Sequence, residues 1–121
     1  MITMKSTIRT ALTNDAALVK LLGGQRVYAV KAPDANVYPR ITYFEMTNFD
    51  RNYADDQAFS SRMVYQVDIW SKGNPDPIAL EVDRVMKTIG FARVGGADLY
   101  ENDVQVYHRA LRYGILKEVE S

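Results

Sequence analysis

The feature that most constrains the fold is the alternation in SSRMVYQVDIWSK, residues 60–72. In a β-strand successive side chains point to opposite faces of the sheet, so this alternation separates two rows. One row is apolar and predicts a buried face: Met63, Tyr65, Val67 and Ile69. The other row carries Val64, Gln66, Asp68 and Trp70, the last being the only tryptophan. The stretch therefore predicts a strand, Ser60 to Ser71, with one core face and one face of mixed polarity.

A second strand is predicted just before it, over Arg40 to Thr47, where a β-branched and aromatic run follows a proline. The polar segment from Asn48 to Phe59 reads as an irregular loop, longer than the ~2 to 5 residues of common hairpin loops. We expect the two strands to form an antiparallel hairpin and this loop to be poorly ordered in the free subunit. Its aromatic residues Phe49, Tyr53 and Phe59 are predicted to contact a neighbouring protein. A solvated connection without a partner is the alternative.

Helical spacing of apolar residues predicts helices in two places. The first spans Ile8 to Leu22, where Asn14-Asp15 would divide it into two short helices and Gly23-Gly24 would end it. The second lies in GNPDPIALEVDRVMKTIG and ends at Gly90. Its apolar residues form one stripe: Ile78, Val82, Val85, Met86 and Ile89. A helix with a single apolar stripe packs on a sheet or on a partner.

The remaining segments predict further strands: a short one at Arg26 to Val30, one or two around Gly95-Gly96, and a long final strand from Val104 to Val119. The chain of 121 residues, 47% of them hydrophobic, suits a single domain over residues 1–121. The expected fold class is α+β. We predict a mixed, mainly antiparallel sheet of four or five strands with two helices packed on it, in the order α-β-β-β-α-β-β.

Composition argues against several classes of function. Lys and Arg number 15, as do Asp and Glu, so no basic field indicates a nucleic-acid partner. The chain has no cysteine, which excludes disulfides, thiolate catalysis and Cys-ligated metals. No segment approaches the ~20 apolar residues of a membrane span, and the N-terminus lacks the apolar core of a signal peptide. We therefore expect no specific nucleic acid and no membrane among the partners.

The search for catalytic and cofactor motifs is mostly negative. His108 is the only histidine, and without a recognisable partner motif it is interpreted as incidental to the last strand. The glycine pairs lack the lysine and Ser/Thr of a phosphate loop. The acidic residues Asp98, Glu101 and Asp103 and the pair Asp55-Asp56 do not match a calcium loop. They are interpreted as solvated loop charge, with a divalent cation as the alternative. We expect no enzyme activity, no metal and no cofactor.

Tyrosine is an unusually frequent residue type in this chain, which contains 8 tyrosines. Its ring combines apolar area with one hydrogen-bonding end, which suits half-wet packing surfaces and protein interfaces. Coverage of a small sheet within a monomer is an equal alternative. Two helices can cover one face of the sheet, which leaves the face of Gln66, Asp68 and Trp70 to meet water or another subunit. Packing of Trp70 beneath one of the chain's own helices stays open.

Several stretches together resemble the tail completion, or tail-to-head joining, proteins of long-tailed bacteriophages. These stretches are LLGGQRVYAV after the early helix, YPRITYFEM, VYQVDIWSK followed by a Pro-initiated helix, and VYHRALRYGIL. The resemblance spans about Ile8 to Lys117. It implies a structural α+β protein, related to tail terminators, that assembles as a ring, usually a hexamer. The ring would cap the tail tube and join it to the head connector, without enzymatic activity or cofactor.

The resemblance also implies partners and a location. The partners would be further copies of the chain, the tail tube and head-connector proteins. The protein would be located in the tail or neck of the virion, after assembly in the host cytoplasm. Because a ring closes through a heterologous interface, Gln66, Asp68 and Trp70 are candidate interface residues, with Trp70 as an aromatic anchor. Another neck or minor tail component, a small α+β ligand-binding domain and a small enzyme are the alternatives.

Overall fold

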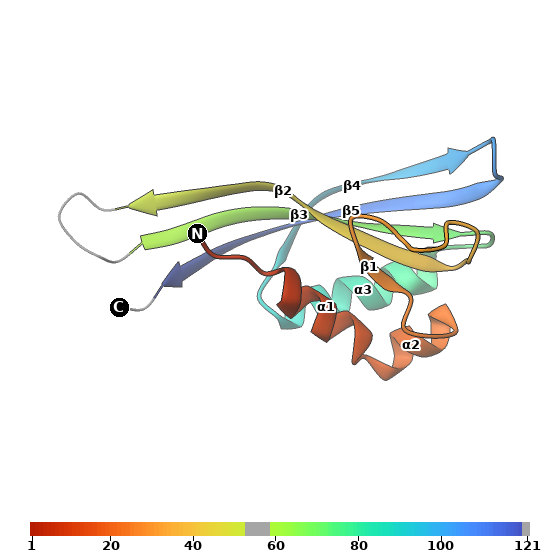
Figure 1. The fold of residues 1–121 in the computed structure, drawn as a ribbon, viewed down its shortest axis with the longest axis horizontal. Coiled ribbons are helices and arrows are strands. Elements are labelled where there is room, and N and C mark those ends of the chain that lie inside the picture. The colour runs from red at the N-terminus through yellow and green to blue at the C-terminus, as the bar shows by residue number, and fades with distance from the viewer. Residues whose placement is uncertain (53–58, 120–121) are drawn as a thin grey trace.

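Residues 1–52 and 59–119 are the part of the chain that the computed structural model describes, and they form three helices and five strands. In chain order these are α1 (Lys5–Thr13), α2 (Ala16–Leu22), β1 (Val27–Ala29), β2 (Arg40–Asn52), β3 (Phe59–Ser71), α3 (Asp76–Thr88), β4 (Ala92–Glu101) and β5 (Val106–Val119). The strands make one sheet in the order β1-β2-β3-β5-β4. All three helices lie on one side of it (Figure 1). The predicted α+β class is confirmed.

The first helical region divides at Asn14-Asp15 into two helices, as the sequence indicated, so the helical layer has three members rather than the two of the predicted fold. Asp15 causes the division, because its carboxylate accepts a hydrogen bond from the Leu18 amide at 3.1 Å and thereby caps α2. Such a cap satisfies one of the backbone donors that a new helix start leaves free. Gly23, with φ 77°, ends α2 in the left-handed conformation, as the sequence indicated.

The β2–β3 hairpin is longer than predicted, because residues 48–52 and Phe59 of the predicted loop from Asn48 to Phe59 belong to strands. Antiparallel pairing continues from Arg40↔Trp70 out to Asn52↔Phe59. The polar residues of this stretch find partners on one face of the strand: the Asn48 side chain donates to the Ile2 carbonyl at 2.8 Å. Because these polar side chains have hydrogen-bond partners, the backbone hydrogen bonds between β2 and β3 can continue without apolar side chains at these positions. The expected disorder of the loop concerns residues 53–58, which lie outside the described part.

The other strands make the sheet mixed. β1 pairs parallel with β2 in the register Val27↔Ile41, whereas β3 pairs antiparallel with both β2 and β5. The region around Gly95-Gly96 forms one strand, β4, with a register shift between Arg93 and Gly95. β3 is therefore the central strand, and its two faces decide what each side of the sheet contacts.

The core fills the space between the helices and one face of the sheet. The predicted apolar row of β3 is fully buried: Met63, Tyr65, Val67 and Ile69. It packs together with the predicted stripe of α3 and with the buried residues of α1 and α2. The polar ends of the buried tyrosines are satisfied, since the Tyr65 hydroxyl accepts from the Met4 amide at 3.0 Å and donates to Glu45 at 2.8 Å. Tyr43, Tyr65 and Tyr113 are thus core residues, which agrees with the monomer-packing interpretation for these three.

Candidate functional site on the open face of the sheet

The face of the sheet that points away from the helices, here called the open face, carries the mixed row predicted for β3. The strand register places Trp70 between Arg40 of β2 and His108 of β5. The next cross-strand rows are Thr42, Asp68 and Ala110, and then Phe44, Gln66 and Arg112. Gln66, Asp68 and Trp70 are therefore brought together on one surface, with side chains of β2 and β5 on both sides.

The centre of the open face is a buried cluster of Asp68, His108 and Trp70. His108 Nε2 lies 2.6 Å from Asp68 Oδ1, and only 5% of Asp68 and 9% of His108 is exposed. The imidazole stacks on the indole with centroids 3.8 Å apart and planes inclined by 14°. The indole N–H donates to the Thr42 hydroxyl at 3.0 Å. Trp70 therefore packs on the open face rather than beneath a helix.

A chain of hydrogen bonds extends this cluster toward the surface. The Arg112 guanidinium donates to the Gln66 carbonyl oxygen at 3.1 Å, and the Gln66 amide donates to Asp68 at 2.8 Å. Asp68 thus receives hydrogen bonds within the sheet on two sides and is not itself presented to solvent. A connected network of this kind fixes the positions of its members. The members that a partner can reach are Gln66, Trp70 and Arg112.

The Asp68–His108 pair resembles the pairs that orient imidazoles in catalytic triads, but its setting differs. The imidazole is almost fully buried and stacked on Trp70, so it is part of the packing of the sheet, and His108 also lines the edge of a cleft of about 580 Å³ beside Pro75 and Leu99. Its Nδ1 accepts or donates no hydrogen bond within the described residues, and the nearest carboxylate oxygen, of Glu101, lies 3.5 Å away. Across residues 1–52 and 59–119, no three His, Asp or Glu side chains are grouped to hold a metal ion.

The remaining predicted contact residues are distributed differently. Phe49 lies on the open face further along β2, opposite Arg62, and is 61% exposed. The backbone of Phe59 pairs with Asn52, but its side chain is outside the described part, as is all of Tyr53. His108 was interpreted as incidental and in fact completes the cluster. No signal in the sequence indicates this, because the contact joins residues 40 positions apart through the β3–β5 register.

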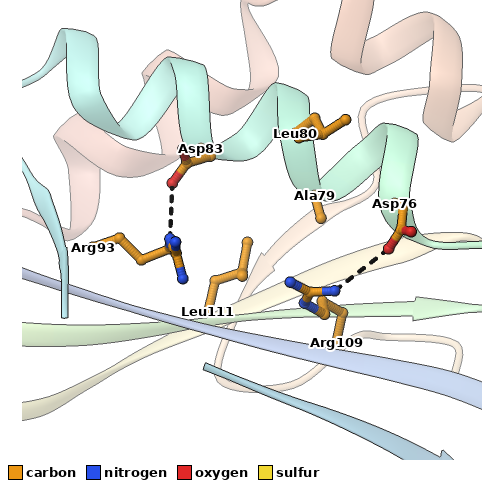
Figure 2. Close-up of a pocket in the computed structure, with 7 residues that line it drawn as sticks. All are labelled: Asp76, Ala79, Leu80, Asp83, Arg93, Arg109 and Leu111. Carbon is orange, nitrogen blue, oxygen red and sulfur yellow. Dashed lines mark hydrogen bonds and ion pairs between the residues drawn. The ribbon is translucent and has the colours of Figure 1, made fainter. Parts of the chain in front are cut away.

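A cleft of about 270 Å³ lies on the other side of the sheet, between α3 and the strands (Figure 2). It is lined by Asp76, Ala79, Leu80, Asp83, Arg93, Arg109 and Leu111. Both arginines are paired: Arg93 with Asp83 at 3.6 Å, and Arg109 with Asp76 at 3.4 Å and Asp98 at 3.0 Å. The pairs with Asp83 and Asp76 connect α3 to the sheet, whereas the pair with Asp98 joins β5 to β4, and the cleft has the character of a helix–sheet junction.

The Asp83 carboxylate in this junction also accepts a hydrogen bond from the Tyr113 hydroxyl at 2.9 Å. Burial, followed by this hydrogen bond and the negative charge of Asp83, raises the pKa of Tyr113 far above its ordinary value of 10.0. The tyrosine therefore stays a neutral donor. The contact fixes α3 over the central strands on the face opposite to the open face.

These features define an α+β protein with a buried polar cluster, centred on Asp68 and His108, on the open face of its sheet. The family model described as tail completion protein gp17 matches residues 6–118, and the chain belongs to this family of phage tail structural proteins. The resemblance seen in the sequence is thereby confirmed. No protein of curated function matches the chain.

The fold is shared with a chain of a solved structure described as the virion of a native gene transfer agent (GTA) particle. The TM-score is 0.68 at 11% sequence identity, and the match covers 93% of this chain and 92% of that chain. At this identity the similarity concerns the fold. Among the described residues, no helix has the length and apolar character needed to cross a membrane.

Proposed function

We propose that this chain is the subunit of a ring that caps the tail tube and joins the tail to the head connector. A hexamer is the ring size that the family resemblance implies. The observation that carries the proposal is the open face, because a wide sheet surface with an aromatic anchor is suited to contact other building blocks. The polar side chains of the described clusters are paired with one another within the chain, which favours a role in protein–protein contact over a role in catalysis.

The contact surface that we assign to this function is centred on Trp70. Its ring is half-buried, and the cluster beneath it holds it in one orientation. Aromatic residues held in this way dominate binding energy in protein interfaces, whereas their polar neighbours mainly provide specificity. Gln66 and Arg112 supply such polar neighbours on one side. Asp68 contributes indirectly, because it positions Gln66 and His108 without reaching the surface.

Rigidity of this surface supports the proposal on energetic grounds. Association is opposed by the ordering of side chains, at roughly 0.5–1.5 kcal/mol for each flexible side chain that becomes fixed. In this protein the ordering has already occurred within the fold, through the stack on His108 and the hydrogen bond to Thr42. A face of this kind can bind its neighbours with little further loss of entropy.

The proposal is tested with Trp70→Ala and Arg112→Glu, and with Tyr100→Ala as a matched control. Tyr100 is 46% exposed but lies on β4, away from the open-face cluster. We expect both open-face variants to reduce the fraction of joined particles at least tenfold in electron micrographs, and Tyr100→Ala to leave it unchanged. Arg112 is exposed and its side chain bonds to Gln66 rather than to the stacked rings, so we expect Arg112→Glu to leave the Trp70 stack intact and its effect to separate binding from folding. Normal joining in both open-face variants would exclude this contact surface.

A deletion experiment tests the role in the particle. Particles produced without this protein should show filled heads separated from tails, or tails of irregular length. Micrographs with normal, joined particles would overturn the proposed function. Separated heads and tails restored by the wild-type protein, but not by Trp70→Ala, would connect the role to the open face.

A further inference from the structure

The sheet extends past the helices as a three-stranded arm, made of residues 47–52 of β2, 59–64 of β3 and 114–119 of β5 (Figure 1). Within the described part of the chain both outer edges of the arm lack a strand partner. β1 pairs with β2 only as far as Tyr43, and β4 pairs with β5 only up to Gly114. Unpaired edges present rows of free N–H and C=O groups, which are templates for pairing with another chain.

The two edges of the arm carry complementary side chains at matching levels. The register aligns Phe49 of β2 with Arg62 and Leu116, and aligns Asp50 of β2 with Ser61 and Lys117. Phe49 and Leu116 are 61% and 47% exposed. Asp50 and Lys117 are exposed as well and carry opposite charges, and the Asp50 carboxylate also accepts from the Ser61 hydroxyl at 2.8 Å and lies 3.6 Å from the Met1 amino group. At each of these two levels, the side chain on the β2 edge is therefore complementary to the side chain on the β5 edge.

We propose that the β5 edge of one arm pairs with the β2 edge of a second copy, in parallel. Leu116 would then lie beside Phe49 of the next copy, and Lys117 beside Asp50 of the next copy. The parallel direction follows from the sheet, because β2 and β5 both run antiparallel to β3. Rotation about an axis along the strands brings β2 of the next copy to β5 in that same direction. Neighbouring side chains of opposite charge and apolar pairs stabilise such strand contacts.

This pairing generates a ring and disfavours a dimer. Two-fold pairing of β2 with β2, or of β5 with β5, centred on these levels would place Asp50 against Asp50 or Lys117 against Lys117, and like charges opposite each other are destabilising. The β5-to-β2 contact is heterologous and closes on itself only as a ring. The inference rests on the proposed ring function.

Cysteine cross-linking tests the contact directly, because the chain has no cysteine of its own. In Phe49→Cys/Leu116→Cys the two thiols of one copy lie on either side of β3, roughly 10 Å apart across two strand spacings. This exceeds the ~7 Å limit for a disulfide, so only a bond between copies can form. We expect oxidised tails carrying this variant to give a ladder of linked copies on a non-reducing gel. Each single variant should stay monomeric on the gel, because its one thiol lies beside a residue without sulfur in the next copy.

The matched control is Phe49→Cys/Leu99→Cys, which moves the second thiol to the exposed face of β4 and should give no ladder. Charge reversal supplies an independent test. Asp50→Lys and Lys117→Asp should each reduce assembly, and the double variant should restore it. If wild-type protein is found at tail ends but neither ladder nor rescue occurs, this inference is overturned and the proposed function stands. If wild-type protein is not found on tails at all, the proposed function itself fails.

Discussion

His108 and Trp70 stack with ring centroids 3.8 Å apart. The same imidazole places its Nε2 2.6 Å from Oδ1 of Asp68, a residue that is only 5% exposed. The open face is therefore as closely organised as the core face, although its residues are polar. A buried carboxylate whose side-chain partners are one imidazole and the Gln66 amide makes the surrounding surface sensitive to small changes. This relationship motivates the first of four predictions.

His108→Ala should lower the free energy of unfolding by about 2–3 kcal/mol, because it leaves the buried Asp68 carboxylate without its closest partner. The quantity is measured by urea denaturation. Asp68→Ala and the double variant complete a double-mutant cycle. Since the double variant leaves no charge uncompensated, its cost should be smaller than the sum of the two single costs. Strictly additive costs would show that the pair is not coupled.

Asp83→Asn should make the free energy of unfolding less dependent on pH under acidic conditions. Burial raises the pKa of Asp83, but hydrogen bonds from Lys87 and Tyr113 outweigh it and hold this pKa below the ordinary value of 3.8. A carboxylate with a lowered folded-state pKa stabilises the protein above its unfolded-state pKa, and this contribution is lost as pH falls through the folded-state pKa.

The measurement for Asp83 is a series of urea midpoints from pH 7 down to about pH 2. The decrease on acidification should be smaller in Asp83→Asn than in the wild type. Tyr113→Phe, which removes one of the donors to Asp83, should fall between the two. Identical pH profiles for wild type and Asp83→Asn would contradict the prediction.

Asp15→Ala should destabilise the protein by about 1 kcal/mol, because α2 loses the side chain that accepts the Leu18 amide. Asp15→Asn is the matched control, since asparagine also serves as a helix cap, and it should retain most of the stability. Thermal melts followed by circular dichroism would measure both. Equal losses in the two variants would assign the effect of Asp15 to its charge, including its ion pair with Arg84, rather than to capping.

Gly96→Ala should cost roughly 1–3 kcal/mol through overpacking. A Cβ at this position would lie 2.8 Å from the Ala110 carbonyl oxygen of the neighbouring strand, and a backbone atom cannot move away without disturbing the β4–β5 pairing. Gly73→Ala is the control, because a Cβ there meets nothing within 4 Å. The control should change stability by no more than about 0.5 kcal/mol. Comparable losses in both variants would refute the steric argument.

Local patterns in the sequence were sufficient for most of the elements. The alternation around Tyr65 predicted which side of β3 is buried, and the stripe that begins at Ile78 predicted which side of α3 faces the sheet. The segment from Asn48 to Asn52 was predicted wrongly as a loop. Its polar residues resemble a turn in sequence, but in the structure they are satisfied by contacts such as that of Asn48 with Ile2, far away in the chain.

By itself, the sequence determined the α+β class, the two faces of β3 and the division at Asp15, because these depend on side-chain periodicity and on hydrogen bonds within a few residues. Only the tertiary structure decided that His108 completes the Asp68 cluster and that Leu116 shares a level with Phe49. Those relationships depend on which strands become neighbours and in what register. Strand order and register follow from burial of the whole sheet, which no local segment encodes.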